Sequence, residues 1–185
     1  MKILVFGFSL RKGSFSRTIA EACEELAPKG TEIELYDIAD IPIFNQDLEH
    51  SMPESVIRFK DAIRNSDALL IVMPEYNYSV PGYLKNAIDF ASRPHQDNVF
   101  AGKPVGIISE STGLLGGARA QYHMRQSFVF LEVVDMKKPE AFITFASEKI
   151  KDGKVVDETT KEHISKYISA LADFAKANAN RNKVA

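Results

Sequence analysis

Cysteine is nearly absent from this chain of 185 residues. Cys23 is its one cysteine, so no disulfide can form within the chain. Structural disulfides are typical of oxidising compartments, and their exclusion leads us to expect a cytoplasmic protein. A chain of this length can bury about 70% of its unfolded surface, so a hydrophobic core can stabilise one domain without cross-links.

Long hydrophobic runs and an excess of positive charge are also missing. No segment approaches the roughly 20 apolar residues of a membrane-spanning helix. The apolar run at residues 3–6 is soon followed by Arg11 and Lys12, which favours a buried strand over a signal sequence. With 23 Lys plus Arg against 25 Asp plus Glu, the net charge is −2. The composition therefore argues against a membrane span and against nucleic acid as a partner.

Residue types that bind metals or form covalent intermediates do not cluster in the sequence. The four histidines show no metal-ligand spacing and Cys23 has no partner cysteine, so no zinc site is predicted. Cys23 lies on an apolar helical stripe, where a buried packing role is favoured, and Lys29 takes the place of the arginine that a phosphatase loop requires. No pattern sets Glu75 and Asp89 face to face for acid–base catalysis. We therefore predict no metal site and name no catalytic side chain.

Short apolar segments alternate along the chain with segments whose apolar residues recur at helical spacing. This alternation is typical of βαβ units, and continuously apolar strands are typical of a parallel sheet covered by helices on both faces. Right-handed crossovers limit the strand orders. We expect an α/β fold, the flavodoxin-like doubly wound five-stranded parallel sheet of order 2-1-3-4-5. The predicted strands cover residues 3–6, 32–36, 68–73, 104–109 and 141–145.

Apolar stripes predict the helices that flank this sheet. Ser51, with Glu54 three residues later, predicts a capping box at the start of the second helix. Residues 121–133 hold many large apolar side chains, and the segment is interpreted either as a subunit contact or as a helix running into a core strand. Residues 1–178 are expected to form a single domain and residues 179–185 a disordered tail. The stripes are Ile19, Ala20, Cys23, Leu26 and Ala27; Val56, Phe59 and Ile63; Leu84, Ala87, Ile88 and Ala91; and Ile164, Ile168, Leu171, Ala172 and Ala175.

The loops after the first, third and fourth strands are the places to look for a ligand, because doubly wound sheets bind ligands beyond the carboxyl ends of their strands. The first loop, residues 8–16, carries three hydroxyl side chains and two cations ahead of a helix, which suits a phosphate group. It lacks the glycine spacing of a dinucleotide-binding loop and the lysine motif of a P-loop, so a monophosphate is favoured. The alternative is a polar turn in which Ser14 or Ser16 only caps the helix.

The second and third loops have different chemistry. Residues 74–82 are stiffened by two prolines and carry Tyr76, Asn77 and Tyr78, which could hold a flat heteroaromatic ring; the alternative is that the tyrosines merely cover the loop. Residues 109–117 are rich in glycine, which permits close approach of the backbone to a ligand. Alone, this third loop is a weak signal.

Taken together, these segments resemble the NADPH-dependent FMN reductase family, including its quinone- and chromate-reducing members. The resemblance spans roughly residues 1 to 146 and rests on Ser9-Leu10-Arg11-Lys12-Gly13-Ser14, Pro74-Glu75-Tyr76-Asn77, Pro81-Gly82-x-Leu84-Lys85-Asn86-Ala87-x-Asp89 and Gly116-Gly117-Ala118-Arg119. It implies an FMN-dependent oxidoreductase, usually a homodimer or homotetramer. Such an enzyme passes hydride from NADPH or NADH to the flavin N5 and then to a quinone, flavin, azo or metal-oxyanion acceptor, in ping-pong order.

The resemblance also implies where the cofactor would be held. The first loop would hold the phosphate, the second would contact the isoalloxazine ring, and the third would lie along the other edge of that ring. Phe8, in place of a small residue, is expected to narrow the mouth of the first loop; Ser16 replaces a common Asn and Phe90 a frequent Trp. The candidate cofactor-binding residues are Ser9, Arg11, Ser14 and Ser16; Pro74, Glu75, Tyr76 and Asn77; and Ser111, Thr112 and Gly113.

Two other functions fit the same fold. One is a flavodoxin-type electron carrier that binds FMN without turning over NAD(P)H. Such carriers are typically strongly acidic, and a net charge of −2 and the absence of a threonine-rich phosphate loop argue against this reading. The other is a regulatory or scaffolding domain that keeps the fold without a flavin.

Overall fold

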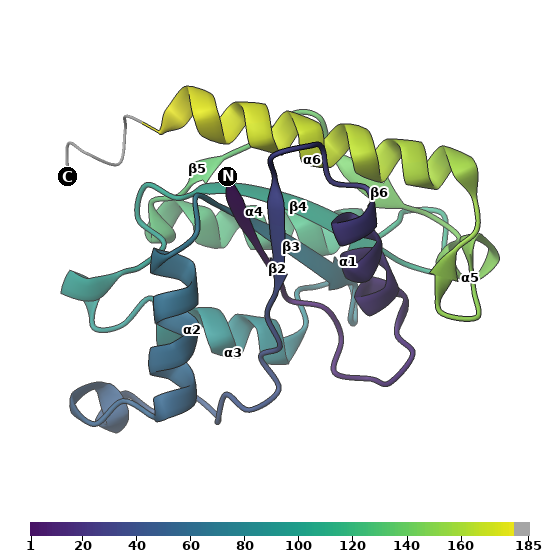
Figure 1. Ribbon diagram of the computed structural model, residues 1–185. Helices are drawn as coiled ribbons and strands as arrows, with labels where there is room; N and C mark the ends of the chain where they lie inside the picture. Colours follow the sequence, from purple (N-terminus) through teal and green to yellow (C-terminus); the bar gives the residue numbers. More distant parts are fainter. Residues whose placement is uncertain (180–185) are drawn as a thin grey trace.

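A parallel sheet with helices on both faces forms the centre of the computed structural model, which describes residues 1–179 (Figure 1). The strand order is β2-β1-β3-β4-β5, with β6 also paired to β4, so the predicted order 2-1-3-4-5 is confirmed. All pairings within this sheet are parallel. The strands are β1 (Lys2–Phe6), β2 (Glu32–Leu35), β3 (Ala68–Pro74), β4 (Pro104–Glu110), β5 (Val134–Asp135) and β6 (Ala141–Ile143).

The helices divide between the two faces of the sheet. Residues from α1 and α6 join one buried cluster, and residues from α2, α3 and α4 join the other. In Figure 1, α6 runs along the upper side of the sheet, with α2 and α3 below it. The main helices are α1 (Phe15–Glu25), α2 (Glu54–Arg64), α3 (Gly82–Ala91), α4 (Ala118–Leu131) and α6 (Glu158–Asn178). Shorter elements are η1 (Gln46–His50), η2 (His95–Asp97), α5 (Ala146–Lys149), β7 (Ile150–Lys151) and β8 (Lys154–Val155).

Alternation along the central strands explains why their sequences are continuously apolar. Successive side chains of a strand point to opposite faces. Ile3 and Val5 of β1 therefore lie in the cluster under α1 and α6, whereas Leu4 and Phe6 lie in the cluster under α2, α3 and α4. Because both faces are covered by helices, neither set can be polar.

The edge of the sheet next to β4 is divided between two short strands. The predicted fifth strand, residues 141–145, forms as β6 over residues 141–143. Strand β6 pairs with the carboxyl end of β4, and β5 pairs with the beginning of β4. Between them, the amide of Ile107 donates a hydrogen bond of 2.7 Å to the hydroxyl of Tyr167 in α6. A side chain at Gly106 would lie 3.0 Å from that hydroxyl. The Tyr167 side chain thus supplies the acceptor that a continuous edge strand would provide.

The predicted capping box at Ser51 is wrong. Helix α2 begins at Glu54 with Pro53 as its N-cap, without a side-chain capping bond, and Ser51 instead ends η1. The residue before a proline is disfavoured in the helical conformation, so Met52 cannot open a helix capped by Ser51. At the other end of the chain, Ala179 is the C-cap of α6, and residues 180–185 of the predicted tail lie outside the described residues.

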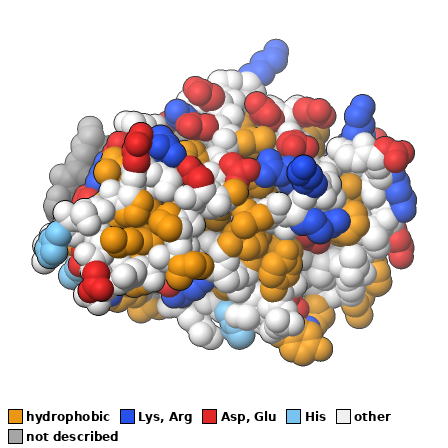
Figure 2. Space-filling model, turned by 90° about the horizontal axis from the view of Figure 1, so that it is seen from below, with side chains coloured by type: hydrophobic (Ala, Val, Ile, Leu, Met, Phe, Trp, Pro, Cys, Tyr) orange, Lys and Arg blue, Asp and Glu red, His pale blue; other side chains and the backbone are white. Residues whose placement is uncertain are grey.

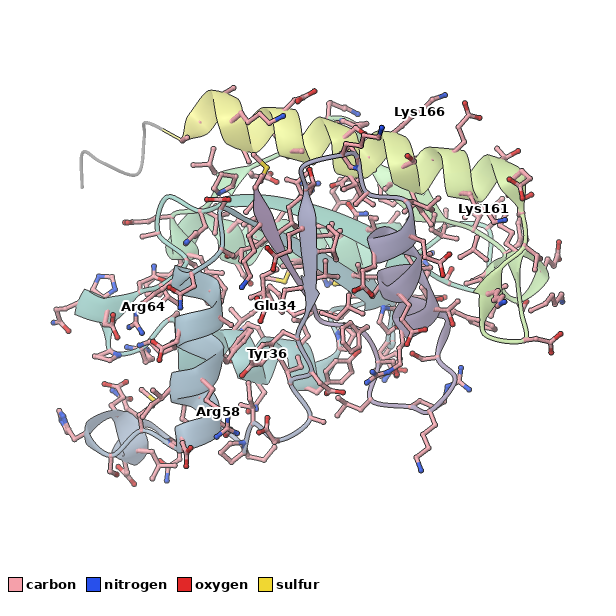
Figure 3. The ribbon with its side chains drawn as sticks, in the orientation of Figure 1. Glu34, Tyr36, Arg58, Arg64, Lys161 and Lys166 are labelled. Carbon is pink, nitrogen blue, oxygen red and sulfur yellow. The ribbon has the colours of Figure 1, made fainter. Side chains whose placement is uncertain are left out.

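Basic side chains lie on both sides of the sheet in the described part of the chain. Figure 3 shows Arg58 and Arg64 on α2 and Lys161 and Lys166 on α6, on opposite sides of the sheet, and each pairs with a carboxylate. In Figure 2 acidic and basic side chains are interspersed with hydrophobic patches. Among residues 1–179, no helix combines the length and apolarity that crossing a membrane requires.

The Tyr167 hydroxyl gives a prediction for stability. Tyr167→Phe leaves the buried amide of Ile107 without an acceptor, and we expect the free energy of unfolding to fall by about 1–3 kcal/mol. Urea denaturation of the variant measures this loss. Tyr78→Phe is the control, because it removes a hydroxyl from an exposed side chain and should change stability by no more than about 0.5 kcal/mol. Equal stability of the two variants would contradict the role assigned to Tyr167.

Candidate functional site

Three loops that are distant in sequence line one pocket of about 230 Å³. They follow β1, β3 and β4, which are adjacent and parallel in the sheet, so their carboxyl ends meet at one edge. The pocket is lined by Ser9, Arg11, Ser14, Phe15, Pro74, Glu75, Tyr76, Glu110, Ser111 and Thr112. Most of the candidate residues from the sequence are therefore brought together in space.

Serine hydroxyls hold the first loop in shape. Ser14 is the N-cap of α1, and its Oγ accepts a hydrogen bond of 3.1 Å from the amide of Arg17. The Oγ of Ser9 accepts from the amide of Arg11 at 3.2 Å. The side chain of Ser16 is fully buried, and its Oγ accepts from the amide of Ser9 at 3.0 Å. Ser14 therefore caps the helix, as the alternative interpretation of this loop expects. Ser16 does not cap the helix; its buried side chain holds the backbone of the loop at Ser9.

The donors around this loop suit an anion. The hydroxyl of Ser14 can still donate its proton, and that of Ser9 can do so when the Tyr76 hydroxyl donates to it. The exposed side chain of Arg11 reaches the lining, and the pocket lies at the amino end of α1, where helix amides carry partial positive charge. A phosphate monoester fits this set of donors.

Phe8 does not narrow the mouth of the loop as expected. Its side chain is only 3% exposed and packs in the core cluster under α1 and α6. The guanidinium of Arg17 lies 4.6 Å from the centroid of its ring, a cation–π distance. Burial of its large apolar ring favours a place in the core, although the family resemblance implies a small residue at this position. The ring therefore lies behind the loop and outside the pocket lining.

The second loop contains a tight two-residue turn. Tyr76 and Ser79 exchange backbone hydrogen bonds of 3.1 and 2.9 Å, and Asn77 and Tyr78 between them have φ angles of 49° and 63°. Positive φ at both central positions is the pattern of a type I′ turn, in which Asn is favoured. The Tyr76 hydroxyl also lies 2.9 Å from the Oγ of Ser9, which ties this loop to the first one.

Glu75 connects the second loop to α4. Its Oε2 accepts hydrogen bonds from the amides of Arg119 at 3.0 Å and Ala120 at 3.2 Å, and its Oε1 lies 3.3 Å from the Arg119 guanidinium. That guanidinium stacks over the ring of Tyr78 at 3.9 Å. A carboxylate at a helix amino end is favourable, so Glu75 fixes the start of α4 beside the pocket.

The glycines of the third loop make room for the protein's own strands. At Gly117, with φ of +82°, a Cβ would lie 2.7 Å from the Cβ of Ser109. At Gly116, with φ of +56°, it would lie 3.0 Å from backbone atoms of Phe142 and Ile143. These two glycines therefore permit close approach to β4 and β6 of the chain itself; close approach of the loop to a ligand stays a prediction.

Some candidate residues do not reach the pocket lining. Ser16 is buried below it, Asn77 is exposed at the tip of the turn, and Gly113 is exposed beyond Ser111 and Thr112. Their roles toward a cofactor stay predictions.

Glu110 is the residue that the sequence analysis missed. It is the last residue of β4, is only 5% exposed and lines the pocket. Burial raises the pKa of its carboxyl to about 7, against the opposing effects of the Arg11 guanidinium and the Ser16 amide. The strand's period of two could have found it, because Glu110 lies on the same face as Ile108, which packs under α1.

Two other side chains considered for catalysis, Asp89 and Cys23, have structural roles in α3 and in the core. Asp89 lies within α3 and pairs with Lys85 at 2.7 Å. Cys23 is fully buried in α1, and desolvation raises the pKa of its thiol to about 12. Within residues 1–179, no three His, Cys, Asp or Glu side chains gather as metal ligands.

Comparison with known proteins identifies the family. The family model described as NADPH-dependent FMN reductase matches residues 1–148. The chain belongs to the NADPH-dependent FMN reductase family. The expected oxidoreductase class, with FMN and a nicotinamide co-substrate, is confirmed at this level.

Individual relatives agree with this assignment. The chain is 42% identical over 171 residues to a quinone reductase of Pseudomonas putida, covering 92% of each chain. It is 44% identical to a quinone reductase of Escherichia coli, covering 90% of each. Among solved structures, the flavoenzyme NAD(P)H:(acceptor) oxidoreductase FerB from Paracoccus denitrificans superimposes with a TM-score of 0.85 at 39% identity, covering 96% of this chain and 97% of that one. The flavodoxin-like fold is thereby confirmed.

The packing at Gly117 gives a second prediction. Gly117→Ala places a Cβ against Ser109 at positive φ, and we expect stability to fall by about 2 kcal/mol or more. Gly82→Ala is the matched control, since a Cβ at Gly82 meets nothing within 4 Å and should change stability by less than about 1 kcal/mol. Chemical denaturation compares the two; a Gly117 variant as stable as the control would show that the contact with β4 does not constrain this turn.

Proposed function

We propose that this chain is an FMN-dependent NAD(P)H:quinone oxidoreductase that holds its flavin in the pocket formed by the three loops. The observation that carries the proposal is the convergence of Ser9, Arg11 and Ser14 with Tyr76 and Ser111 on one lining. This lining has an end that suits an anion and an end that carries an aromatic side chain, which match the phosphate and the ring system of FMN. Residues 1–178 would form one FMN-binding unit.

Each loop would have its own role in binding. Arg11 and the hydroxyls of Ser9 and Ser14 would hold the phosphate at the amino end of α1. Pro74, Glu75, Tyr76 and Asn77 would face the ring system from one side, and Ser111, Thr112 and Gly113 would bound it from the other. The internal hydrogen bonds of these loops support the proposal, because a preformed site loses little conformational freedom on binding.

Ser9, Arg11 and Ser14 would hold FMN, which would supply the redox chemistry: hydride transfer from NAD(P)H to the flavin N5 and from there to the acceptor, in ping-pong order. The chain's own residues bind and orient, and none needs to act as nucleophile or general acid. Tyr76 and Tyr78, which are 44% and 65% exposed, offer aromatic surface beside the pocket on which a planar quinone can stack. Flavins, azo compounds and metal oxyanions are further candidate acceptors.

Helix α4 supports a proposal for assembly. Its segment at residues 121–133 buries Phe128 and Leu131, yet leaves Tyr122, Val129 and Phe130 more than half exposed. The helix leads into the short strand β5, so the two interpretations of this segment are compatible. We propose that its exposed side forms a subunit contact in a homodimer or homotetramer. The lone buried Cys23 is consistent with action in the cytoplasm.

An absorption spectrum followed by anaerobic titration with NADPH tests the function. Protein loaded with FMN should lose its visible flavin absorption on addition of about one equivalent of NADPH and regain it when a quinone is added. Protein that binds FMN but is not reduced by NADPH or NADH would be a carrier. Protein that stays colourless with FMN would be a flavin-free domain, and either result would defeat the proposal.

Arg11 gives the sharpest binding prediction. Arg11→Ala should weaken FMN binding by about 1.5–3 kcal/mol, because it removes a charge-assisted phosphate contact. Quenching of flavin fluorescence measures the dissociation constant. The control is Lys12→Ala, which removes the adjacent exposed cation outside the pocket lining and should have a smaller effect. Similar losses for both variants would remove Arg11 from the phosphate site.

Two variants of Asn77 distinguish its backbone role in the turn from a contact of its side-chain amide with the flavin ring. Asn77→Gly keeps the positive φ of the turn without strain, whereas Asn77→Ala strains it. If the amide contacts the ring, both variants should shift the spectrum of bound flavin while phosphate affinity is kept. A shift in the alanine variant alone would assign Asn77 to the turn and not to the ring, and no shift in either would remove the residue from the site.

A further inference from the structure

Glu110 places a buried carboxyl inside a pocket that otherwise offers donors to an anion. The register of the sheet sets it between Pro74 of β3 and Ile143 of β6. Its position on the face of Ile108 directs it toward the side of the sheet covered by α1, whose Ser16 amide acts to lower the pKa of its carboxyl. It is therefore an internal titratable carboxyl at the same helix end that would receive a phosphate.

The groups around Glu110 come from every element that borders the pocket. The first loop contributes the guanidinium of Arg11 and the amide of Ser16, which favour the ionised carboxylate, while burial disfavours it and raises its pKa to about 7. Helix α3 contributes Tyr83, and burial, Tyr76 and Glu110 together raise the pKa of its hydroxyl. The remaining acid of the lining, Glu75, is engaged with Arg119 at the start of α4.

A phosphate and an ionised Glu110 would compete for these donors. Two anions in one pocket repel each other, and a like charge favours the protonated form of a carboxyl. Only Arg11 brings a full positive charge to the lining, so it cannot neutralise both a carboxylate and a phosphate ester carrying about −1.5 to −2 charges at pH 7.

We propose that Glu110 takes up a proton from solvent when the phosphate of FMN enters the pocket and returns it when the flavin leaves. Glu110 thereby determines specificity: it sets the pH range in which the chain holds FMN, and it lowers the advantage of FMN over riboflavin as the pH rises. The inference rests on the proposed function, because it takes FMN as the ligand.

The test compares two flavins and two proteins across pH. Dissociation constants for FMN and for riboflavin, which lacks the phosphate, are measured by fluorescence quenching from pH 6.5 to 8.5 with the wild type and with Glu110→Gln. For the wild type we expect FMN binding to weaken by about tenfold over this range, with little change for riboflavin. The glutamine variant should bind FMN more tightly than the wild type at pH 8.5. Because free FMN titrates with a pKa of about 6, the difference between the two proteins is the deciding quantity.

Proton uptake gives a second readout that does not depend on the variant. Calorimetry of FMN binding to the wild type at pH 7.5, in buffers of different ionisation enthalpy, should show net uptake of a proton that riboflavin binding lacks. Parallel FMN curves for wild type and Glu110→Gln, or no proton uptake by the wild type, would overturn the role of Glu110 and leave the proposed function intact. Failure of both proteins to bind FMN at any pH would instead overturn the proposed function.

Discussion

Parallel pairing of β1, β3 and β4 is the constraint on which the rest of the structure depends. Residues 2–6, 68–74 and 104–110 run in the same direction with their carboxyl ends at one edge. Three loops that begin at residues 8, 74 and 109 therefore have to meet. The hydrophobic burial that fixes the register also fixes the place of the site, since a slip of one residue would exchange the two core faces.

The loops at this edge are held mainly by their own polar groups. Ser16 supports Ser9, Ser9 contacts Tyr76, and Glu75 fixes the start of α4. Glu110 differs from these, because burial outweighs the opposing effects of Arg11 and Ser16 and raises the pKa of its carboxyl to about 7. A site that is rigid around one titratable group can couple ligand charge to a proton without a change of backbone conformation.

Much of this arrangement could be predicted from the sequence because it follows from local pattern. Continuous apolar strands and helical stripes reflect burial on two faces, and right-handed crossovers leave few strand orders. The three loops were found as interruptions of that pattern. Features that depend on residues distant in sequence could not be predicted in this way. The sharing of the sheet edge by β5 and β6 is one of them, because it depends on Tyr167, which is 60 residues from Ile107. Similarly, Ser51 has the residues of a capping box, but the backbone restriction before Pro53 overrides it.

Glu110 shows the limit for the site itself. Glu110 ends the apolar strand β4, and alternation places it on the face of Ile108, but its burial there follows from tertiary packing that no local pattern contains. For Gly116 and Gly117 the pattern predicts close approach, but it cannot show the packing against β6, because that strand comes from a segment some 25 residues further along the chain. Individual ligand contacts are decided by tertiary structure in the same way.

A titration of ¹⁵N-labelled protein with FMN, followed by amide chemical shifts, tests the central claim most directly. Amides of residues 9–16, 75–79 and 110–113 should shift together with a single dissociation constant, while amides lining the groove between α4 and α6, such as those of Val129 and Phe174, should stay in place. Shifts confined to one loop, or centred on that groove, would contradict the convergence of the three loops on one flavin.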